Sequence, residues 1–138
     1  MSLLHASTVA FGRDGGIIIL GPSGAGKSTL ALRLIASGAQ LVADDRTIVM
    51  AHQGRLYARA PRPIAGRIEA RGLGILAYAP LRLARVRLVV DLALPPARMP
   101  PEAARSLEGV TLPLLPGDRG EAFVAALRQY IAQGRSKA

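Results

Sequence analysis

Short apolar segments alternate with glycine, proline and polar residues along most of the chain, a pattern that predicts a fold rich in strands. Four compact apolar runs predict strands, and they cover residues 6–11, 16–20, 40–43 and 86–92. Two further runs, residues 47–51 and 56–59, flank a turn that ends at Gly54 and predict a hairpin. Residues 12–15 predict a tight turn between the first two strands.

Helical spacing is evident in only two places. Residues 28–36 have the spacing of a helix, and Gly38 supplies a residue that can end it in the left-handed conformation. Phe123, Leu127, Tyr130 and Ile131 mark the apolar face of a closing helix. The predicted fold class is therefore α/β, a single domain in which helices flank a twisted mixed sheet.

A phosphate-binding motif joins the strand at 16–20 to the first helix. It fits the pattern G-x-x-x-x-G-K-[ST] and consists of Gly21, Pro22, Ser23, Gly24, Ala25, Gly26, Lys27 and Ser28. Glycines let backbone N–H groups wrap a polyphosphate, and the helix start adds the positive end of its dipole. Lys27 would neutralise the β- and γ-phosphates, and the Ser28 hydroxyl would coordinate Mg²⁺. The motif predicts a site for ATP with Mg²⁺.

Two adjacent carboxylates, Asp44 and Asp45, follow the predicted strand at 40–43. A carboxylate at the end of a neighbouring strand is the usual partner of a phosphate-binding loop. Neighbouring side chains on a strand point to opposite faces, so only one of the pair would face the phosphates unless both lie in a loop. The alternative is a helix cap or a turn-forming pair without a role in chemistry.

Composition and charge limit the cellular location and the kinds of partner that we expect. The chain of 138 residues has a net charge of +9, no cysteine and only 4% aromatic residues. No apolar run approaches the ~20 residues of a membrane span, so we expect a cytoplasmic protein with no membrane association. Residues 55–87 contain eight arginines and a single acid, Glu69. They form a solvated basic face or a surface for an acidic partner, while the scarcity of aromatics argues against nucleic acid.

Three blocks of sequence resemble the HPr kinase/phosphorylase family. They are residues 27–45, which resemble its catalytic core, residues 68–75, which resemble its signature loop LEIRGLGI, and residues 86–92, which resemble the strand that follows. The resemblance implies the fold shared by HPr kinase and PEP carboxykinase. It also implies a short form in which residues 1–138 are one kinase domain, without the N-terminal domain of longer members.

The resemblance implies an ATP- and Mg²⁺-dependent kinase that phosphorylates a serine of HPr, reverses the reaction by phosphorolysis and assembles as a homohexamer. The implied roles are phosphate binding by Lys27, proton transfer by Asp45, Mg²⁺ binding by Ser28 and Glu69 with Asp44 in the outer shell, and contacts to the transferred phosphate by His5 and Arg98. Pro22 and Thr29 depart from the family pattern, which has an acid at each position.

Two alternatives from other classes remain open. The chain could be an ATP-binding regulatory module with weak catalysis that presents its basic surface to a partner. It could also be a P-loop kinase of small molecules, although one helix and one strand between Lys27 and Asp44 leave no room for a lid. A turnover assay with HPr-type proteins separates these classes.

Overall fold

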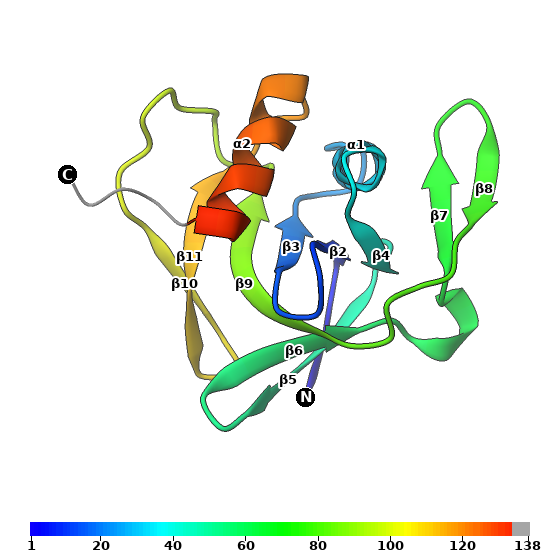
Figure 1. The fold of residues 1–138 in the computed structure, drawn as a ribbon, viewed down its shortest axis with the longest axis horizontal. Coiled ribbons are helices and arrows are strands. Elements are labelled where there is room, and N and C mark those ends of the chain that lie inside the picture. Colours follow the sequence, from blue (N-terminus) through cyan, green and yellow to red (C-terminus); the bar gives the residue numbers. More distant parts are fainter. Residues whose placement is uncertain (134–138) are drawn as a thin grey trace.

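The computed structural model describes residues 1–133, which contain a curled sheet of nine strands, a separate two-stranded hairpin and two α-helices (Figure 1). The large sheet comprises β1 (Ser2–Leu4), β2 (Ala6–Ala10), β3 (Gly16–Leu20), β4 (Gln40–Ala43), β5 (Thr47–His52), β6 (Arg55–Arg59), β9 (Ala84–Asp91), β10 (Ala104–Leu107) and β11 (Val110–Pro116). The hairpin comprises β7 (Arg67–Ala70) and β8 (Gly74–Ala77), and the helices are α1 (Lys27–Ala36) and α2 (Glu121–Gln133). Within the described part, no helix is long and apolar enough to cross a membrane.

The centre of the sheet brings several strand ends to one edge. β3 lies between β9, which is parallel to it, and β2, which is antiparallel, so Leu20 pairs with both Asp91 and Ala6. β4 is antiparallel to β2, and it therefore ends at the same edge as β3. The turn after β3 and the residues after β4 are close in space because of this pairing. This edge carries the candidate site.

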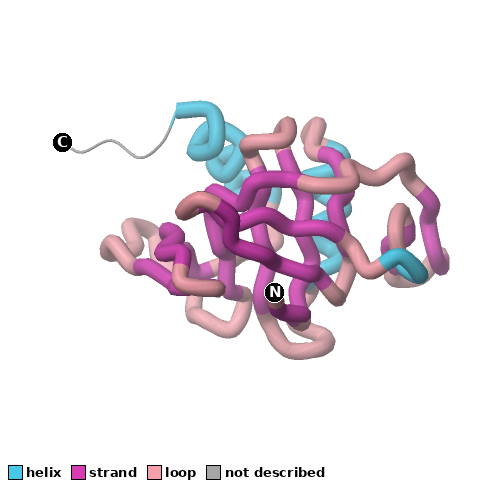
Figure 2. Tube along the Cα trace, turned by 90° about the horizontal axis from the view of Figure 1, so that it is seen from below, coloured by secondary structure: helices cyan, strands magenta, loops and turns pink. Residues whose placement is uncertain are grey.

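Two apolar layers pack against the central strands. The layer under the two helices includes Ile17, Ile19, Leu30, Leu34, Leu88, Val90 and Leu127. The opposite face buries Ile18, Val42, Val49, Leu56 and Val89, where the sheet curls over itself. Figure 2 shows this strand-covered side, with both α-helices on the far face. Because β3 is covered on both faces, every one of its residues is buried, as its unbroken apolar run requires.

Most predicted elements are confirmed, some with shifted ends. The strands at 16–20 and 40–43 have the predicted bounds, and the strand predicted at 86–92 spans Ala84–Asp91. The first helix begins at Lys27 and is followed by Gly38 with φ +115°. The β5–β6 turn places Gln53 and Gly54 at positive φ. The mixed sheet with packed helices confirms the predicted α/β class.

Other elements were not predicted. Residues 62–64 form one turn of 3₁₀ helix inside the segment expected to be a loop. The hairpin of β7 and β8 lies in the block assigned as a glycine-rich loop, and β10 and β11 follow the proline-rich stretch expected to be irregular. β8 and β10 are four residues long and mostly exposed, and Pro113 interrupts the apolar residues of β11, so none of the three has a long buried apolar run.

Candidate active site

The phosphate-binding turn joins β3 to α1 at the strand-end edge of the sheet. Gly24 (φ +84°) and Gly26 (φ +99°) adopt the left-handed conformation that favours glycine, and the Ala25 N–H donates to the Pro22 carbonyl at 3.0 Å. Gly26 caps α1 without a side-chain hydrogen bond, and the first turn of α1 contains no acidic residue. The first N–H groups of the helix are therefore free of side-chain acceptors and can meet an anion.

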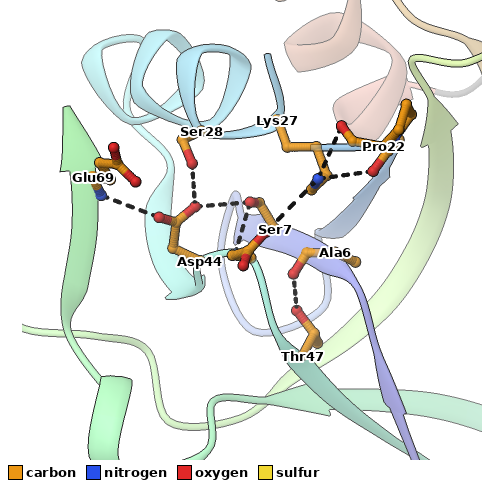
Figure 3. A network of polar contacts seen from close by, with 10 residues as sticks. Ala6, Ser7, Pro22, Lys27, Ser28, Asp44, Thr47 and Glu69 are labelled. Atoms are coloured by element: carbon orange, nitrogen blue, oxygen red, sulfur yellow. Dashed lines mark hydrogen bonds and ion pairs between the residues drawn. The ribbon is translucent and has the colours of Figure 1, made fainter. Parts of the chain in front are cut away.

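Lys27 is held inside this turn. Its ammonium donates to the carbonyls of Gly21 at 2.8 Å and Pro22 at 3.3 Å, and it lies 3.8 Å from Asp45 Oδ1 (Figure 3). Only 5% of the side chain is exposed. The two carbonyl acceptors hold the buried ammonium at the phosphate-binding turn.

Asp44 ties three segments together. Its Oδ1 accepts hydrogen bonds from the hydroxyls of Ser28 at 2.7 Å and Ser7 at 2.8 Å, and its Oδ2 accepts the Glu69 backbone N–H at 3.1 Å (Figure 3). The residue is buried. The phosphate-binding turn, β2 and the β7–β8 hairpin thus meet at one carboxylate, which is consistent with a role in holding a metal beside Ser28.

Asp45 lies beyond the end of β4, and its φ of +64° is rare for a residue other than glycine. Its N–H donates to Ser7 Oγ at 3.0 Å, and its side chain is 54% exposed. The alternation of a strand therefore does not apply to the pair, and both carboxylates line one cleft. A left-handed aspartate costs on the order of 1 kcal/mol, and such strain is concentrated at functional sites.

The cleft has a volume of about 290 Å³. It is lined by Ser23, Gly24, Gly26, Lys27, Ser28, Thr29, Asp44, Asp45, Glu69, Arg71 and Arg119. A larger hollow of about 550 Å³, near Tyr130 at the end of α2, contains arginines but no carboxylate among its lining residues. The smaller cleft combines the phosphate-binding turn and Lys27 with three carboxylates, so the chemistry is assigned there.

The structure brings most predicted site residues together but not all of them. Lys27, Ser28, Asp44, Asp45 and Glu69 line the cleft, and Gly21, Pro22 and Ala25 shape the turn beside it. His5 precedes β2 at the same edge but is exposed and does not line the cleft. Arg98 is exposed in the segment between β9 and β10, also outside the cleft.

Sequence reasoning missed four residues of the site. Thr29, Arg71 and Arg119 line the cleft, and Ser7 links the two aspartates from a fully buried position in β2. Arg71 could have been identified from the sequence, because it lies within the block that resembles the family's signature loop. For Ser7 the sequence offers weaker evidence: a serine in a buried apolar strand needs a polar partner.

The oxygen donors of the cleft supply part of the ligand set that a hard cation such as Mg²⁺ needs. Among residues 1–133, no group of three or more histidine, cysteine, aspartate or glutamate side chains is arranged to hold a metal. Mg²⁺ commonly takes one or two carboxylates and completes its octahedron with phosphate oxygens and water. The Ser28 hydroxyl and the Asp44 carboxylate, already in contact, match that smaller donor set.

The site has the architecture of a P-loop phosphate-binding protein. A glycine-rich turn with Lys27 joins a strand to a helix, and Ser28, the residue after the lysine, is hydrogen-bonded to Asp44. The chain belongs to the HPr kinase family, because residues 2–81 match the family model described as HPr Serine kinase C-terminal domain. The resemblance found in the sequence is confirmed.

Three relatives illustrate the similarity. The HPr kinases/phosphorylases of Clostridium beijerinckii and Clostridium tetani are 48% identical to this chain over 61 residues, and that of Mycoplasmopsis pulmonis is 41% identical over 61 residues. Each match covers 44% of this chain and 20% of the relative. The Hpr(Ser) kinase/phosphatase structure from Coxiella burnetii matches with a TM-score of 0.78 at 24% identity, covering 94% of this chain and 95% of that one. The structural match confirms the fold.

Proposed function

We propose that this chain is an ATP- and Mg²⁺-dependent protein kinase that phosphorylates a serine of an HPr-type phosphocarrier. The observation that carries the proposal is the hydrogen bond from the Ser28 hydroxyl to Asp44, with Lys27 beside Asp45 in the same cleft. It joins a phosphate-binding turn to a carboxylate pair, the two parts that phosphoryl transfer requires. Membership of the HPr kinase family supports an HPr-type protein as the acceptor.

The phosphate side of the reaction uses the turn and its lysine. Backbone N–H groups at the start of α1 would bind the β- and γ-phosphates of ATP, and Lys27 would turn from the Gly21 carbonyl to the phosphates. Ser28, Asp44 and Glu69 would hold Mg²⁺ directly or through water. The metal supplies charge neutralisation along the β- and γ-oxygens.

The proton side is assigned to Asp45. As the serine oxygen bonds to the γ-phosphorus and the bond to the β-phosphate oxygen breaks, the hydroxyl proton passes to the Asp45 carboxylate and ADP leaves. Asp45 faces the open cleft, whereas both Asp44 oxygens already accept hydrogen bonds from protein groups. In the phosphorolytic direction inorganic phosphate would attack phosphoserine, releasing pyrophosphate, and Asp45 would return the proton.

Two further assignments concern the acceptor. His5 and Arg98 would contact the transferred phosphate. His5 precedes β2, which begins at the cleft edge, and Arg98 follows β9, which ends there. Each is exposed, so each would have to turn toward the cleft when the acceptor binds. A homohexamer in the cytoplasm, where the phosphocarriers act, completes the proposal.

The test mixes the purified chain with Mg-ATP and HPr-type proteins and locates any phosphate by mass spectrometry. The expected result is a single phosphoserine that disappears when that serine of the acceptor is replaced by alanine. ATP binding without phosphorylation of any phosphocarrier would instead favour a regulatory module. Transfer to small molecules alone would favour the third class, a small-molecule kinase.

A further inference from the structure

The strongest unassigned feature of the cleft is the position of Arg119 on the phosphate-binding turn. A Cβ atom placed on Gly26 would lie 2.3 Å from Arg119 Cδ and 2.9 Å from Nη1. The arginine side chain therefore crosses the space that the missing side chain of Gly26 leaves open. Gly26 is also the N-cap of α1, directly before Lys27. Arg119 thus reaches the start of α1 from the segment between β11 and α2.

The backbone around Arg119 holds this position. The end of β11 pairs with the end of β9, with Pro116 opposite Asp91, and the Gly117 N–H donates to the Asp91 carbonyl at 3.0 Å. Gly117 is pressed onto β9 so closely that a Cβ there would lie 2.8 Å from Val90 Cγ1. Asp118 Oδ1 then accepts the N–H of Arg119 at 2.6 Å, which sets the direction of the chain as it enters α2.

Arg119 differs from Lys27, whose ammonium lies 3.8 Å from Asp45 Oδ1. Within residues 1–133, no carboxylate lies within ion-pair distance of the Arg119 guanidinium. Lys27 and the positive end of α1 lie next to it, and the first turn of that helix has no acid. Asp44, Asp45 and Glu69 line the same cleft, but none of these carboxylates pairs with Arg119. The guanidinium is therefore available to an anionic ligand.

We propose that Arg119 binds the polyphosphate of the nucleotide, opposite Lys27, as a second cation contributed from the start of α2. This inference rests on the proposed function and specifies the residues that hold its substrate. A guanidinium presents a fork of N–H donors that fits two phosphate oxygens at once, a geometry that the Lys27 ammonium does not have. The glycine at position 26 leaves room for that fork beside the helix N-terminus.

The test measures binding of ADP and of inorganic pyrophosphate to the full chain by calorimetry, without any acceptor protein. Arg119→Ala should weaken both ligands by about 10- to 100-fold, the usual loss for charge-assisted hydrogen bonds. Arg119→Lys should recover part of that loss. Arg105→Ala removes an equally exposed arginine from β10, outside the cleft, and should bind like wild type. Thermal unfolding without ligand should be the same for wild type and the three variants.

The outcomes separate this inference from the proposed function. If wild type binds both ligands and Arg119→Ala binds them as tightly as Arg105→Ala does, Arg119 does not hold the phosphates, and the kinase proposal stands. Loss of ADP binding with normal pyrophosphate binding would place Arg119 on the nucleoside and overturn the inference. If wild type binds neither ligand, the phosphate site and the kinase proposal both fail.

Discussion

The two rims of the cleft are built in different ways. One rim is the phosphate-binding turn with the aspartate pair, where Lys27 is 5% exposed and every strand behind it belongs to the large sheet. The other rim is the β7–β8 hairpin, a sheet of its own that stands away from the rest in Figure 1. At its tip Leu73 is 75% exposed and Ile75 is 64% exposed.

The hairpin is attached to the rest of the fold along one side, where Ala70 is buried and Leu76 packs against the apolar layer of α1. Ile68 is buried in the apolar layer of α1, and the neighbouring Glu69 N–H donates to Asp44. Burial alternates along β7, and β8 is mostly exposed. The phosphates would therefore meet a rigid surface backed by two cores, while Glu69 and Arg71 lie on a projection of low local stability. Adjustment to a protein acceptor is expected on that second rim.

The largest effect is expected at the rigid rim. Ser28→Ala and Lys27→Ala should each lower phosphoryl transfer by at least about 10²–10³-fold, as loss of one preorganised charge-stabilising group does. Rates with an HPr-type acceptor measure this. Ser37→Ala, at the other end of α1, is the matched control for the serine and should keep normal activity. Wild-type transfer by Lys27→Ala would refute the phosphate site.

The next largest effects are expected at the two aspartates, which should differ in the step that they affect. Asp45→Asn should lower the transfer rate by at least ~10²-fold and change Mg-ATP affinity only a few-fold, because it removes proton transfer but not phosphate binding. Asp44→Asn should act mainly on the Mg²⁺ requirement, since Asp44 is bonded to Ser28. Rate and affinity measured for both variants decide the assignment. If the two patterns are exchanged, Asp44 is the base and Asp45 orients Lys27.

A smaller effect is expected at the base of the hairpin. Glu69→Gln should raise the Mg²⁺ concentration for half-maximal rate by about 10-fold, because it removes the charge of one oxygen ligand but keeps the backbone contact to Asp44. Magnesium titration of the transfer rate measures it. Glu102→Gln, an exposed glutamate outside the cleft, is the control. Identical Mg²⁺ dependence in both variants would remove Glu69 from the metal site.

The smallest effect is expected at the hairpin tip. Leu73→Ser should change the free energy of unfolding by less than about 0.5 kcal/mol, whereas Leu30→Ala, in the buried face of α1, should cost about 2–5 kcal/mol. ADP affinity should be unchanged in Leu73→Ser. Denaturant unfolding and calorimetry measure the two quantities. A large loss of stability from the tip variant would mean that the hairpin is part of the rigid rim.

Local patterns were sufficient to predict the centre of the fold. The run of residues 16–20 and the motif after it contain their own strand, turn and helix signals, so β3, the phosphate-binding turn and α1 could be placed from sequence. The carboxylate pair could be placed near Lys27 but not oriented. Its orientation depends on the left-handed φ of Asp45, which the side-chain pattern does not encode.

Contacts between distant segments could not be predicted. Ser7 reaches the aspartates because β4 pairs with β2, and Arg119 reaches Gly26 because β11 pairs with β9. Neither pairing leaves a local signature in the sequence. Arg98, chosen as the counterpart of the family's downstream arginine, lies outside the cleft, and its role and that of His5 stay predictions.

The parallel pairing of β3 with β9 also affects how the protein folds. Leu20 pairs with Asp91, and β4 to β8 with their connections lie between the two strands in the chain. Closing so long a segment must lose chain entropy before the pairing contributes stability, which places such topologies among the slower single domains to fold. Arg119 reaches the cleft through the pairing of β11 with β9, so the cleft is complete only when these distant segments have paired. We therefore expect a newly made chain to acquire the complete cleft late, together with its core.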